Sequence, residues 1–296
     1  MSEAPLVSVM MPCFNAERTL SMALASLRAQ TYPNWEAVIV DDGSTDQTWN
    51  ILQAWRDSRL RLERFERNRG RGAARQRCLE MANGAFLSFL DADDWLFEEK
   101  LKHQVSLMRH RPEVVVVSGT CVITDADGEA VGLTSAGLEA GDQVTERSFA
   151  RLGAPPVSFP PCMIRTSAAQ GARFNPAFRR SQDSDFLIQV MLGRRYAVSS
   201  VPVYAYSQAE AASLEKTMDG YRYRIRSYAQ YTKSHPAQAS LEMLKTLAKM
   251  SFYRVAGWLH TERSLIERRW QPITPEARDA YNSARASIIR QTIKGP

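Results

Sequence analysis

The stretch that decides the fold is AFLSFLDADD, residues 85–94. Its apolar half is short and lies between Gly84 and a run of acids, which is typical of a buried strand rather than a helix. The carboxylates of Asp91, Asp93 and Asp94 at the end of such a strand repel one another and are costly to desolvate. A hard divalent cation relieves both costs, because Mg²⁺ and Mn²⁺ prefer oxygen ligands and are often shared with substrate phosphates. The stretch therefore predicts a metal–diphosphate site; the alternative is a solvated acidic turn that caps the helix after it.

Strand-like and helix-like segments alternate around this stretch. The expected strands are residues 6–11, 37–40, 60–65, 85–90 and 113–118, and the expected helices are about 15–30, 45–55, 72–81 and 96–109. This alternation is typical of βαβ units and of a mostly parallel sheet with helices on both faces. Right-handed crossovers bring the carboxyl ends of the strands to one edge, where ligands bind in open α/β sheets. Three polar clusters are expected at that edge: PCFN (12–15), DDGS (41–44) and DAD (91–93).

Length and composition narrow the class of protein. A chain of 296 residues with 44% hydrophobic residues suits one large domain, or one domain with an appendage. No apolar run reaches the roughly 18 residues of a membrane span, and the first residues do not resemble a signal peptide. The four cysteines lie far apart and match no zinc or redox spacing, so we expect reduced, buried thiols.

Charge is distributed unevenly along the chain. Residues 216–296 hold fifteen Lys and Arg against six Asp and Glu, a net charge of +9, which leaves −3 for the first 215 residues of a chain whose net charge is +6. This basic part is expected to be helical, and it mixes cations with apolar and aromatic residues. It indicates an anionic membrane surface or another polyanion as partner. The alternatives are a solvated helical face, packing on the rest of the chain, or packing on a second subunit in a homodimer.

Five motifs follow one another along the first 94 residues: VSVMMPCFN (7–15), QTYPNWE (30–36), VIVDDGSTD (38–46), NRG (68–70) with Ala74 and Arg75, and LDADD (90–94). In this order they resemble glycosyltransferase family 2, a large group of inverting enzymes with the GT-A fold. The likeness extends from residue 6 to about residue 206. The expected fold class is therefore α/β of the Rossmann-like GT-A type, a mostly parallel sheet with helices on both faces, plus a C-terminal α-helical extension.

The resemblance also implies a domain plan and a reaction. A GT-A domain is expected over residues 1–215, with a nucleotide-binding half (about 1–118) and an acceptor-binding half (about 119–215), followed by a basic helical extension over 216–296. The implied enzyme is a metal-dependent inverting hexosyltransferase. With Mn²⁺ or Mg²⁺ it would move a sugar from a nucleotide-diphosphate sugar, a UDP-sugar foremost, to a glycan or lipid-linked acceptor in bacterial surface polysaccharide or lipopolysaccharide synthesis. Its expected location is the cytoplasm, either free or at the inner face of the plasma membrane, with no nucleic-acid partner.

The resemblance implies roles for residues of the nucleotide-binding half. Asp93 would ligate the cation, and Asp91 would hold the ribose or a metal-bound water. Asp94 would bind the sugar or cap the following helix. Arg71 or Arg75 would bind the diphosphate through a bidentate guanidinium contact. The remaining residues implied in donor binding are Pro12, Phe14, Asn15, Asp41, Asp42 and Ala92. Of the two adjacent acids, we favour Asp42 over Asp41 for recognition of the base.

The base that takes the acceptor proton is expected in the segment RRSQDSDF, residues 179–186. We predict Asp183 for this role, with Asp185 as the competitor that would otherwise cap the next helix. Gln182 stands where the family commonly has Glu, and the loss of that neighbouring charge should lower the pKa of the base. Arg179 and Arg180 are expected either to contact donor phosphate or acceptor, or to be solvated.

Two other functions fit less well. A sugar-nucleotide nucleotidyltransferase usually opens with a Gly-rich phosphate loop and a Lys, and PCFN at 12–15 has neither. A non-catalytic donor-binding subunit would not need Asp91, Asp93 and Asp183. One departure from the family is that no Arg or His is obvious in the loop after Tyr206, which in relatives closes over the diphosphate.

Overall fold

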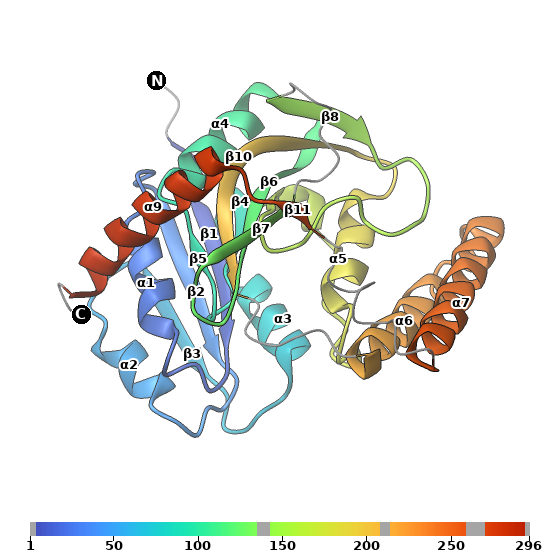
Figure 1. Cartoon of the computed structure of the whole chain (residues 1–296), viewed down its shortest axis with the longest axis horizontal. Helices are drawn as coiled ribbons and strands as arrows, with labels where there is room; N and C mark the ends of the chain where they lie inside the picture. Colours follow the sequence, from blue (N-terminus) through green and yellow to red (C-terminus); the bar gives the residue numbers. More distant parts are fainter. Residues whose placement is uncertain (1–3, 135–142, 208–213, 259–269, 294–296) are drawn as a thin grey trace.

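A computed structural model describes residues 4–134, 143–207, 214–258 and 270–293. These residues form a central sheet with helices on both faces, and a pair of helices that stands at one end (Figure 1). The predicted α/β fold of the GT-A type is confirmed by this architecture and by its structural neighbours, which are described below.

The nucleotide-binding half of the sheet is parallel. Its strands lie in the order β4-β1-β2-β3, and every pair among them runs parallel. The bounds are β1 Val7–Cys13, β2 Trp35–Asp41, β3 Leu60–Arg64 and β4 Phe86–Phe89. Each apolar run that predicted a strand is therefore found as one, and the three polar clusters follow strands that point the same way.

The second half of the sheet is mixed. The antiparallel strand β9 (Met163–Arg165) separates β4 from β6 (Val114–Thr124). Strand β10 (Arg195–Ser207) runs parallel to β6. The other strands pair antiparallel: β5 (Trp95–Leu96), β7 (Ala130–Thr134), β8 (Val144–Ser148) and β11 (Gln271–Pro272). The fifth expected strand thus starts as predicted but extends to Thr124, because long pairing with β10 continues past Ser118.

Alternation along the strands builds two cores. In β2, Ala37 and Ile39 face one core, and Val38 and Val40 face the other. Such double-sided burial is expected of strands covered on both faces. The first core is closed by α1 (Leu20–Arg28), α2 (Thr48–Ala54), α4 (Lys100–His110) and α9 (Pro275–Ile293). The second is closed by α3 (Arg71–Met81), α5 (Gln182–Met191) and the short 3₁₀ helix Thr166–Ala169.

Two helices begin later than their apolar spacing predicts. The helix expected from residue 15 begins at Leu20, and the helix expected from 45 begins at Thr48. The residues before them bond to each other instead: the Ala16 N–H donates to Thr48 Oγ1 at 2.7 Å, and the Glu17 N–H donates to Asp46 at 3.1 Å. Polar side chains that cap backbone groups across two loops compete with helix formation at these positions.

The C-terminal part contacts the sheet domain at both ends of the molecule. Helices α6 (Leu214–Ala229) and α7 (Pro236–Trp258) pack on each other, and Tyr228 and Ala239 enter the second core. Further on, β11 pairs with β7, and α9 packs against α1 on the opposite side (Figure 1). The Tyr281 hydroxyl donates to the Gly128 carbonyl at 2.6 Å. No helix among the described residues combines the length and the apolar character that crossing a bilayer requires.

Candidate active site at the carboxyl edge of the sheet

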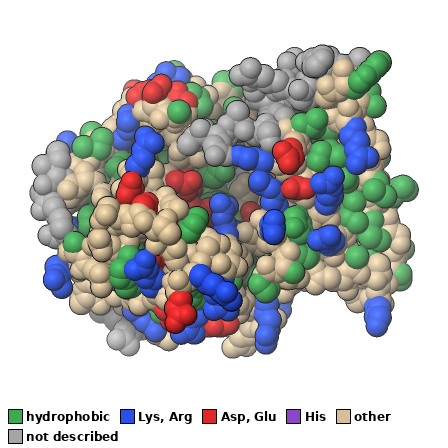
Figure 2. All heavy atoms as spheres, turned by 90° about the horizontal axis from the view of Figure 1, so that it is seen from below, with side chains coloured by type: hydrophobic (Ala, Val, Ile, Leu, Met, Phe, Trp, Pro, Cys, Tyr) green, Lys and Arg blue, Asp and Glu red, His purple; other side chains and the backbone are tan. Residues whose placement is uncertain are grey.

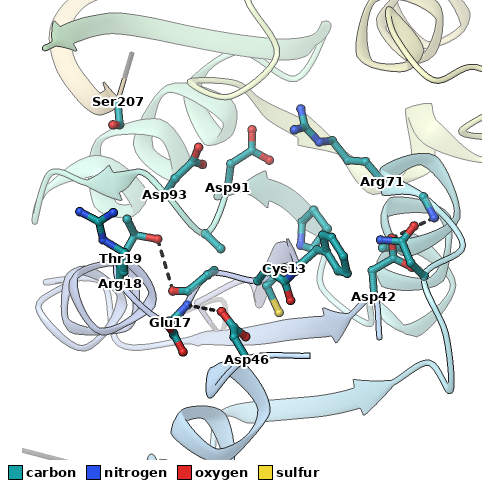
Figure 3. A pocket seen from close by; sticks show the side chains of 18 of the residues that line it. Cys13, Glu17, Arg18, Thr19, Asp42, Asp46, Arg71, Asp91, Asp93 and Ser207 are labelled. Atoms are coloured by element: carbon teal, nitrogen blue, oxygen red, sulfur yellow. Dashed lines mark hydrogen bonds between the residues drawn. The ribbon is translucent and has the colours of Figure 1, made fainter. Parts of the chain in front are cut away.

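A cavity of about 700 Å³ opens where the parallel strands end (Figure 3). All three polar clusters predicted for this edge contribute to its wall, together with the start of α3 and the end of β10. The lining residues are Pro12–Thr19, Asp42, Asp46, Asn68, Gly70, Arg71, Ala74, Asp91–Asp93, Ala126 and Ser207. Of the predicted donor-site residues, the structure therefore brings Pro12, Phe14, Asn15, Asp42, Arg71, Asp91, Ala92 and Asp93 together around one cavity.

Asn15 joins the first loop to the second. It adopts a left-handed backbone conformation with φ of 48°, its N–H donates to Ser44 Oγ at 2.9 Å, and its side-chain oxygen accepts the Thr45 N–H at 2.9 Å. Asn tolerates this conformation better than most residues. The ring of Phe14, which is 46% exposed, is left on the cavity wall. An aromatic face on a polar cavity can stack against a heterocyclic base.

Asp41 and Asp42 are adjacent in sequence but have different surroundings. The Asp41 carboxylate is fully buried, accepts hydrogen bonds from the N–H and hydroxyl of Ser44, and pairs with Arg64 Nε at 3.1 Å. Asp42 lines the cavity and accepts the backbone N–H groups of Arg69 at 2.7 Å and Gly70 at 2.9 Å. Burial raises the pKa of Asp42. Asp42 therefore reaches the cavity, whereas Asp41 holds the turn behind it.

Arg71 and Arg75 lie one turn apart on α3 and also differ. Arg75 is 3% exposed, donates to Asp91 Oδ1 at 2.8 Å, and lies over the ring of Phe159. Burial alone would lower the pKa of Arg75, but the charges of Asp91 and Asp183 raise it. Arg71 lines the cavity, and its guanidinium makes no ion pair or hydrogen bond with the rest of the described chain. Arg71 is thus the arginine whose guanidinium is available to a bound anion. Arg75 instead neutralises the charge of Asp91 from the buried side.

The three acids of the DADD motif are in three different states. Burial would raise the pKa of Asp91, but the guanidinium charges of Arg75 and Arg71 hold it below its usual value. Burial of the Asp93 carboxyl in the cavity, and then the charge of Asp91, raise the pKa of Asp93. Asp94 is 2% exposed and accepts the Tyr204 hydroxyl and the Ser207 N–H, both at 2.7 Å. Asp94 therefore lies beneath the cavity and fastens the motif to β10.

The residues around Asp93 fit a hard divalent cation. Asp91 and Asp93 point into the same space (Figure 3), and Asp93 has no protein cation of its own, whereas Asp91 has Arg75. Two carboxylates suit Mg²⁺ or Mn²⁺. In the parts of the chain that the structure describes, no three His, Cys, Asp or Glu residues are grouped so that they could hold a metal by themselves. A cation here would need further ligands from a bound phosphate and from water.

The structure separates the two acids of the QDSD motif. Asp183 is half-buried in the first turn of α5, and one of its oxygens accepts the Ser184 N–H at 2.7 Å. Asp185 is 1% exposed and accepts hydrogen bonds from the Ser227 hydroxyl at 2.5 Å, from Gln189 at 2.9 Å and from Gln230 at 3.1 Å. Asp185 therefore fastens α5 to α6. Asp183 lies near the Arg75–Asp91 pair, whose arginine its charge affects.

The structure also shows what sequence reasoning missed or left open. Arg179 and Arg180 are exposed just before α5 and do not line the cavity. Glu17, Arg18, Thr19 and Asp46 do line it, although the sequence singled out none of them. The sequence gives Tyr204 no role, yet its hydroxyl donates to Asp94 and accepts the Asp91 N–H at 3.0 Å. A tyrosine facing inward from a buried strand is the signal that could have indicated such a polar network.

Comparisons with known proteins identify the family of the chain. A family model described as "Glycosyl transferase family 2" matches residues 8–171. The chain is 43% identical over 103 residues to the Escherichia coli UDP-Glc:alpha-D-GlcNAc-diphosphoundecaprenol beta-1,3-glucosyltransferase WfgD. The aligned segment covers 35% of this chain and 41% of that protein. It is 41% identical over 109 residues to the putative teichuronic acid biosynthesis glycosyltransferase TuaG of Bacillus subtilis, covering 36% of this chain and 43% of the relative. The chain thus matches less than half the length of these relatives.

Solved structures share the fold over nearly the whole chain. Staphylococcus aureus TarS 1–349 in complex with UDP superposes with a TM-score of 0.63 at 22% identity, covering 97% of this chain and 88% of that one. The mannosyltransferase PcManGT from Pyrobaculum calidifontis, solved with GDP-Man and Mn²⁺, gives a TM-score of 0.58 at 18% identity and covers 99% and 87%. At these identities the likeness shows the fold. Because the family model matches more than half of the 296 residues, the chain belongs to glycosyl transferase family 2.

Proposed function

We propose that this protein transfers a sugar from a nucleoside-diphosphate sugar, a UDP-sugar in the first instance, to a hydroxyl group of a glycan or lipid-linked acceptor in bacterial polysaccharide synthesis. One observation carries the proposal. Three separate segments bring Asp42, Arg71 and Asp93 to one cavity at the carboxyl edge of the sheet, where a base, a diphosphate and a cation each find a suitable group. The cavity volume, about 700 Å³, lies within the range of small-ligand sites.

The donor would lie across the ends of β1, β2 and β4. Phe14 offers a ring for the base, and Asp42 offers an acceptor for a base N–H or a ribose hydroxyl. Asp91 and Ala92 stand at the ribose side. Arg71 would bind the diphosphate, assisted by the N–H groups at the start of α3. The structures of TarS with UDP and with UDP-GlcNAc, and the relative named for UDP-Glc, support a uridine donor.

Asp93, assisted by Asp91, would hold the divalent cation. When bound, such a cation supplies positive charge against the negative charge that builds on the departing diphosphate. The neighbour solved with Mn²⁺ supports this assignment. Arg75 has a different part: its buried charge keeps Asp91 ionised, so that the motif retains at least one carboxylate in its charged form.

Asp183 would be the base. The acceptor oxygen attacks the anomeric carbon from the face opposite the diphosphate, a new C–O bond forms, and the bond to the diphosphate oxygen breaks. The acceptor proton passes to the Asp183 carboxylate, and the nucleoside diphosphate leaves. The Asp185 carboxylate already accepts hydrogen bonds from Ser227, Gln189 and Gln230. This favours Asp183 over Asp185 as the base. Arg179 and Arg180 are exposed just before α5 and outside the cavity lining, and they would contact an anionic acceptor or the donor phosphate.

The acceptor, the domain plan and the location complete the proposal. The relative named for a diphosphoundecaprenol acceptor supports a lipid-linked acceptor. We propose residues 1–215 as the catalytic GT-A domain, with nucleotide and acceptor halves meeting near residue 118, and 216–296 as the extension. All four cysteines are buried and free, which favours a reducing compartment such as the cytoplasm.

Thermal unfolding with a panel of nucleotides tests donor binding. UDP with Mn²⁺ should raise the melting temperature more than UDP alone or GDP with Mn²⁺, because ligand binding stabilises the folded state by about 2.7 kcal/mol at a hundredfold excess over Kd. A panel without any shift from a nucleoside diphosphate would overturn the proposal.

Product analysis then separates the candidate functions. A glycosyltransferase should release UDP slowly from a UDP-sugar, even when water is the acceptor. A non-catalytic donor-binding subunit should show the thermal shift without UDP release, and a nucleotidyltransferase should instead release pyrophosphate from UTP and a sugar phosphate.

A further inference from the structure

Helix α7 carries an exposed apolar face. Of the ten large apolar side chains that are exposed among the described residues, six lie on this one helix. They are Leu241, Leu244, Leu247, Phe252, Val255 and Trp258, exposed by 50, 65, 49, 58, 56 and 80%. The buried residues of α7, such as Thr246 and Met250, lie on the other side, toward α6. Contiguous apolar surface of this kind marks an interaction site.

The spacing of these residues makes one stripe along the helix. Positions 241, 244, 248, 251, 255 and 258 alternate steps of three and four, so they lie along a single side. Leu247 and Phe252 widen the stripe at its two edges. Ala248 and Ser251 occupy the remaining places, and no acidic residue interrupts the stripe.

Cations border the stripe on both sides. By helical geometry Lys245 and Lys249 lie along one edge and Arg254 along the other. The one acid of α7, Glu242, is paired with Lys245 Nζ at 2.8 Å. Residues 214–258 hold eight Lys and Arg against three Asp and Glu. Figure 2 shows hydrophobic and basic side chains side by side at the end of the molecule where α7 stands.

We propose that the apolar face of α7 docks onto an anionic lipid surface, with the helix lying in the plane of the interface. The apolar side chains would enter the boundary between headgroups and acyl chains, and the bordering cations would meet lipid phosphates. Trp258 and Phe252 are the residue types that favour this boundary. Helix α7 lies on the outside of the helix pair (Figure 1), and the side chains of its apolar face are exposed in the described part of the chain.

Charge argues against a second copy of this chain as the occupant. If two α7 stripes paired as a coiled coil, the bordering positions of each helix would face those of the other. These positions carry Lys245 and Arg254 and no acid, so cations would oppose cations. An anionic lipid surface would instead attract these cations.

Flotation with lipid vesicles tests the proposal on the full chain. The protein should float with vesicles in which about a third of the lipid is phosphatidylglycerol and the rest phosphatidylcholine, and float poorly with phosphatidylcholine alone. Added salt should weaken binding, because it screens the cations. Absence of flotation with the anionic vesicles would overturn the proposal.

Two variants with the same change in charge sharpen the test. Leu244→Glu with Val255→Glu places two acids on the stripe and should reduce partitioning at least about tenfold. The control, Asn282→Glu with Ile289→Glu, adds the same charge at exposed positions of α9, at the other end of the molecule, and should bind as the wild type does. Equal flotation of both variants would exclude α7 as the docking face.

Three further measurements separate loss of docking from loss of fold, of activity or of a dimer. Circular dichroism and release of UDP from donor in solution should be unchanged in both variants, which shows that the site and fold are intact. Light scattering should give a monomer mass for the wild type. A dimer that Leu244→Glu with Val255→Glu dissociates would instead show that a second copy covers the stripe, and would overturn the lipid proposal.

Discussion

At the carboxyl edge of the sheet, aspartates near the surface and aspartates in the layer just beneath it have different surroundings. We call these the upper and the lower layer. In the upper layer, Asp93 lines the cavity and Asp183 is half-buried in the first turn of α5, and both keep a carboxylate oxygen without a side-chain partner among the described residues. In the lower layer, Asp94 and Asp185 are almost fully buried, and protein hydroxyl, amide and N–H groups occupy their oxygens. Within each motif, one acid keeps a carboxylate oxygen without a side-chain partner in the described chain, and its neighbour holds two elements of the fold together. This difference shows that the aspartates of one motif have to be assigned their roles one by one.

The two acids of the Asp41–Asp42 pair also differ in their surroundings, but the difference is smaller. Asp41 is inside the turn, and Asp42 reaches the cavity while its oxygens also accept two backbone N–H groups. Each acid still has capacity for a further hydrogen bond, since a carboxylate offers about four acceptor sites. Asp42 therefore both lines the cavity and holds the backbone of the neighbouring loop.

The largest effect should come from the upper layer. Asp93→Ala should lower UDP release at least about a thousandfold, since electrostatic stabilisation of the leaving group is worth several kcal/mol. Circular dichroism should be unchanged, because Asp93 lies on the cavity wall and no other described side chain depends on its carboxylate for a hydrogen bond. The additional thermal shift that Mn²⁺ gives with UDP should disappear. A variant that keeps this shift would place the metal elsewhere.

Removing the base should be nearly as severe. Asp183→Asn should lose transfer by about a hundred- to ten-thousandfold, the range usual for general-base catalysis. The thermal shift with UDP and Mn²⁺ should remain, because Asp183 does not line the donor cavity. Steady-state transfer and thermal unfolding measured on the same sample check both statements. Turnover close to that of the wild type would move the base to another residue.

The lower layer should respond in stability instead. Asp185→Ala leaves the Ser227 hydroxyl and two amide side chains without their acceptor, which should cost about 1–3 kcal/mol of unfolding free energy. Urea denaturation measures this as a lower midpoint. Ser184→Ala, one residue away, is the control and should change stability by less than about 0.5 kcal/mol. If Asp185→Ala abolished transfer as thoroughly as Asp183→Asn without loss of stability, the two roles would have to be exchanged.

A buried lysine beneath the edge gives a pH test of the lower layer. Lys100 is fully buried with its Nζ on the Pro161 carbonyl at 3.1 Å, and burial lowers its pKa to about 7. Its pKa in the unfolded chain is about 10.4. Between these values the unfolded state binds a proton that the folded state lacks, so stability should rise with pH, by at most about 1.4 kcal/mol per unit.

Lys100→Met removes the titrating group from this comparison. Urea denaturation at pH 7, 8 and 9 should show a smaller rise for Lys100→Met than for the wild type, with the difference between the two proteins narrowing as pH increases. The Pro161 carbonyl keeps a partner in the variant, because the Gln104 amide also donates to it at 2.7 Å. Parallel pH profiles for both proteins would contradict the inferred state of Lys100.

The position of the cavity could be predicted closely, and the organisation of the residues around it could not. Short apolar runs between breakers located the parallel strands, and the polar clusters after them located the cavity, because strand ends in a parallel sheet meet at one edge. Arg71 and Arg75 remained equivalent at that level. Only the fold shows that Arg75 is buried against Asp91 and Phe159 while Arg71 faces the cavity.

By itself, the sequence determined the parallel strands of the nucleotide half, the edge of the sheet at which the cavity lies, and the family. These depend on local periodicity and short motifs, which a few adjacent residues encode. The tertiary structure alone decided which acid of each motif is available, since Asp94 meets a tyrosine 110 residues away and Asp185 a serine 42 residues away. It also decided that β11 and α9 return to the sheet domain while α7 keeps an apolar stripe exposed. Such contacts depend on how distant segments pack, and no local pattern records them.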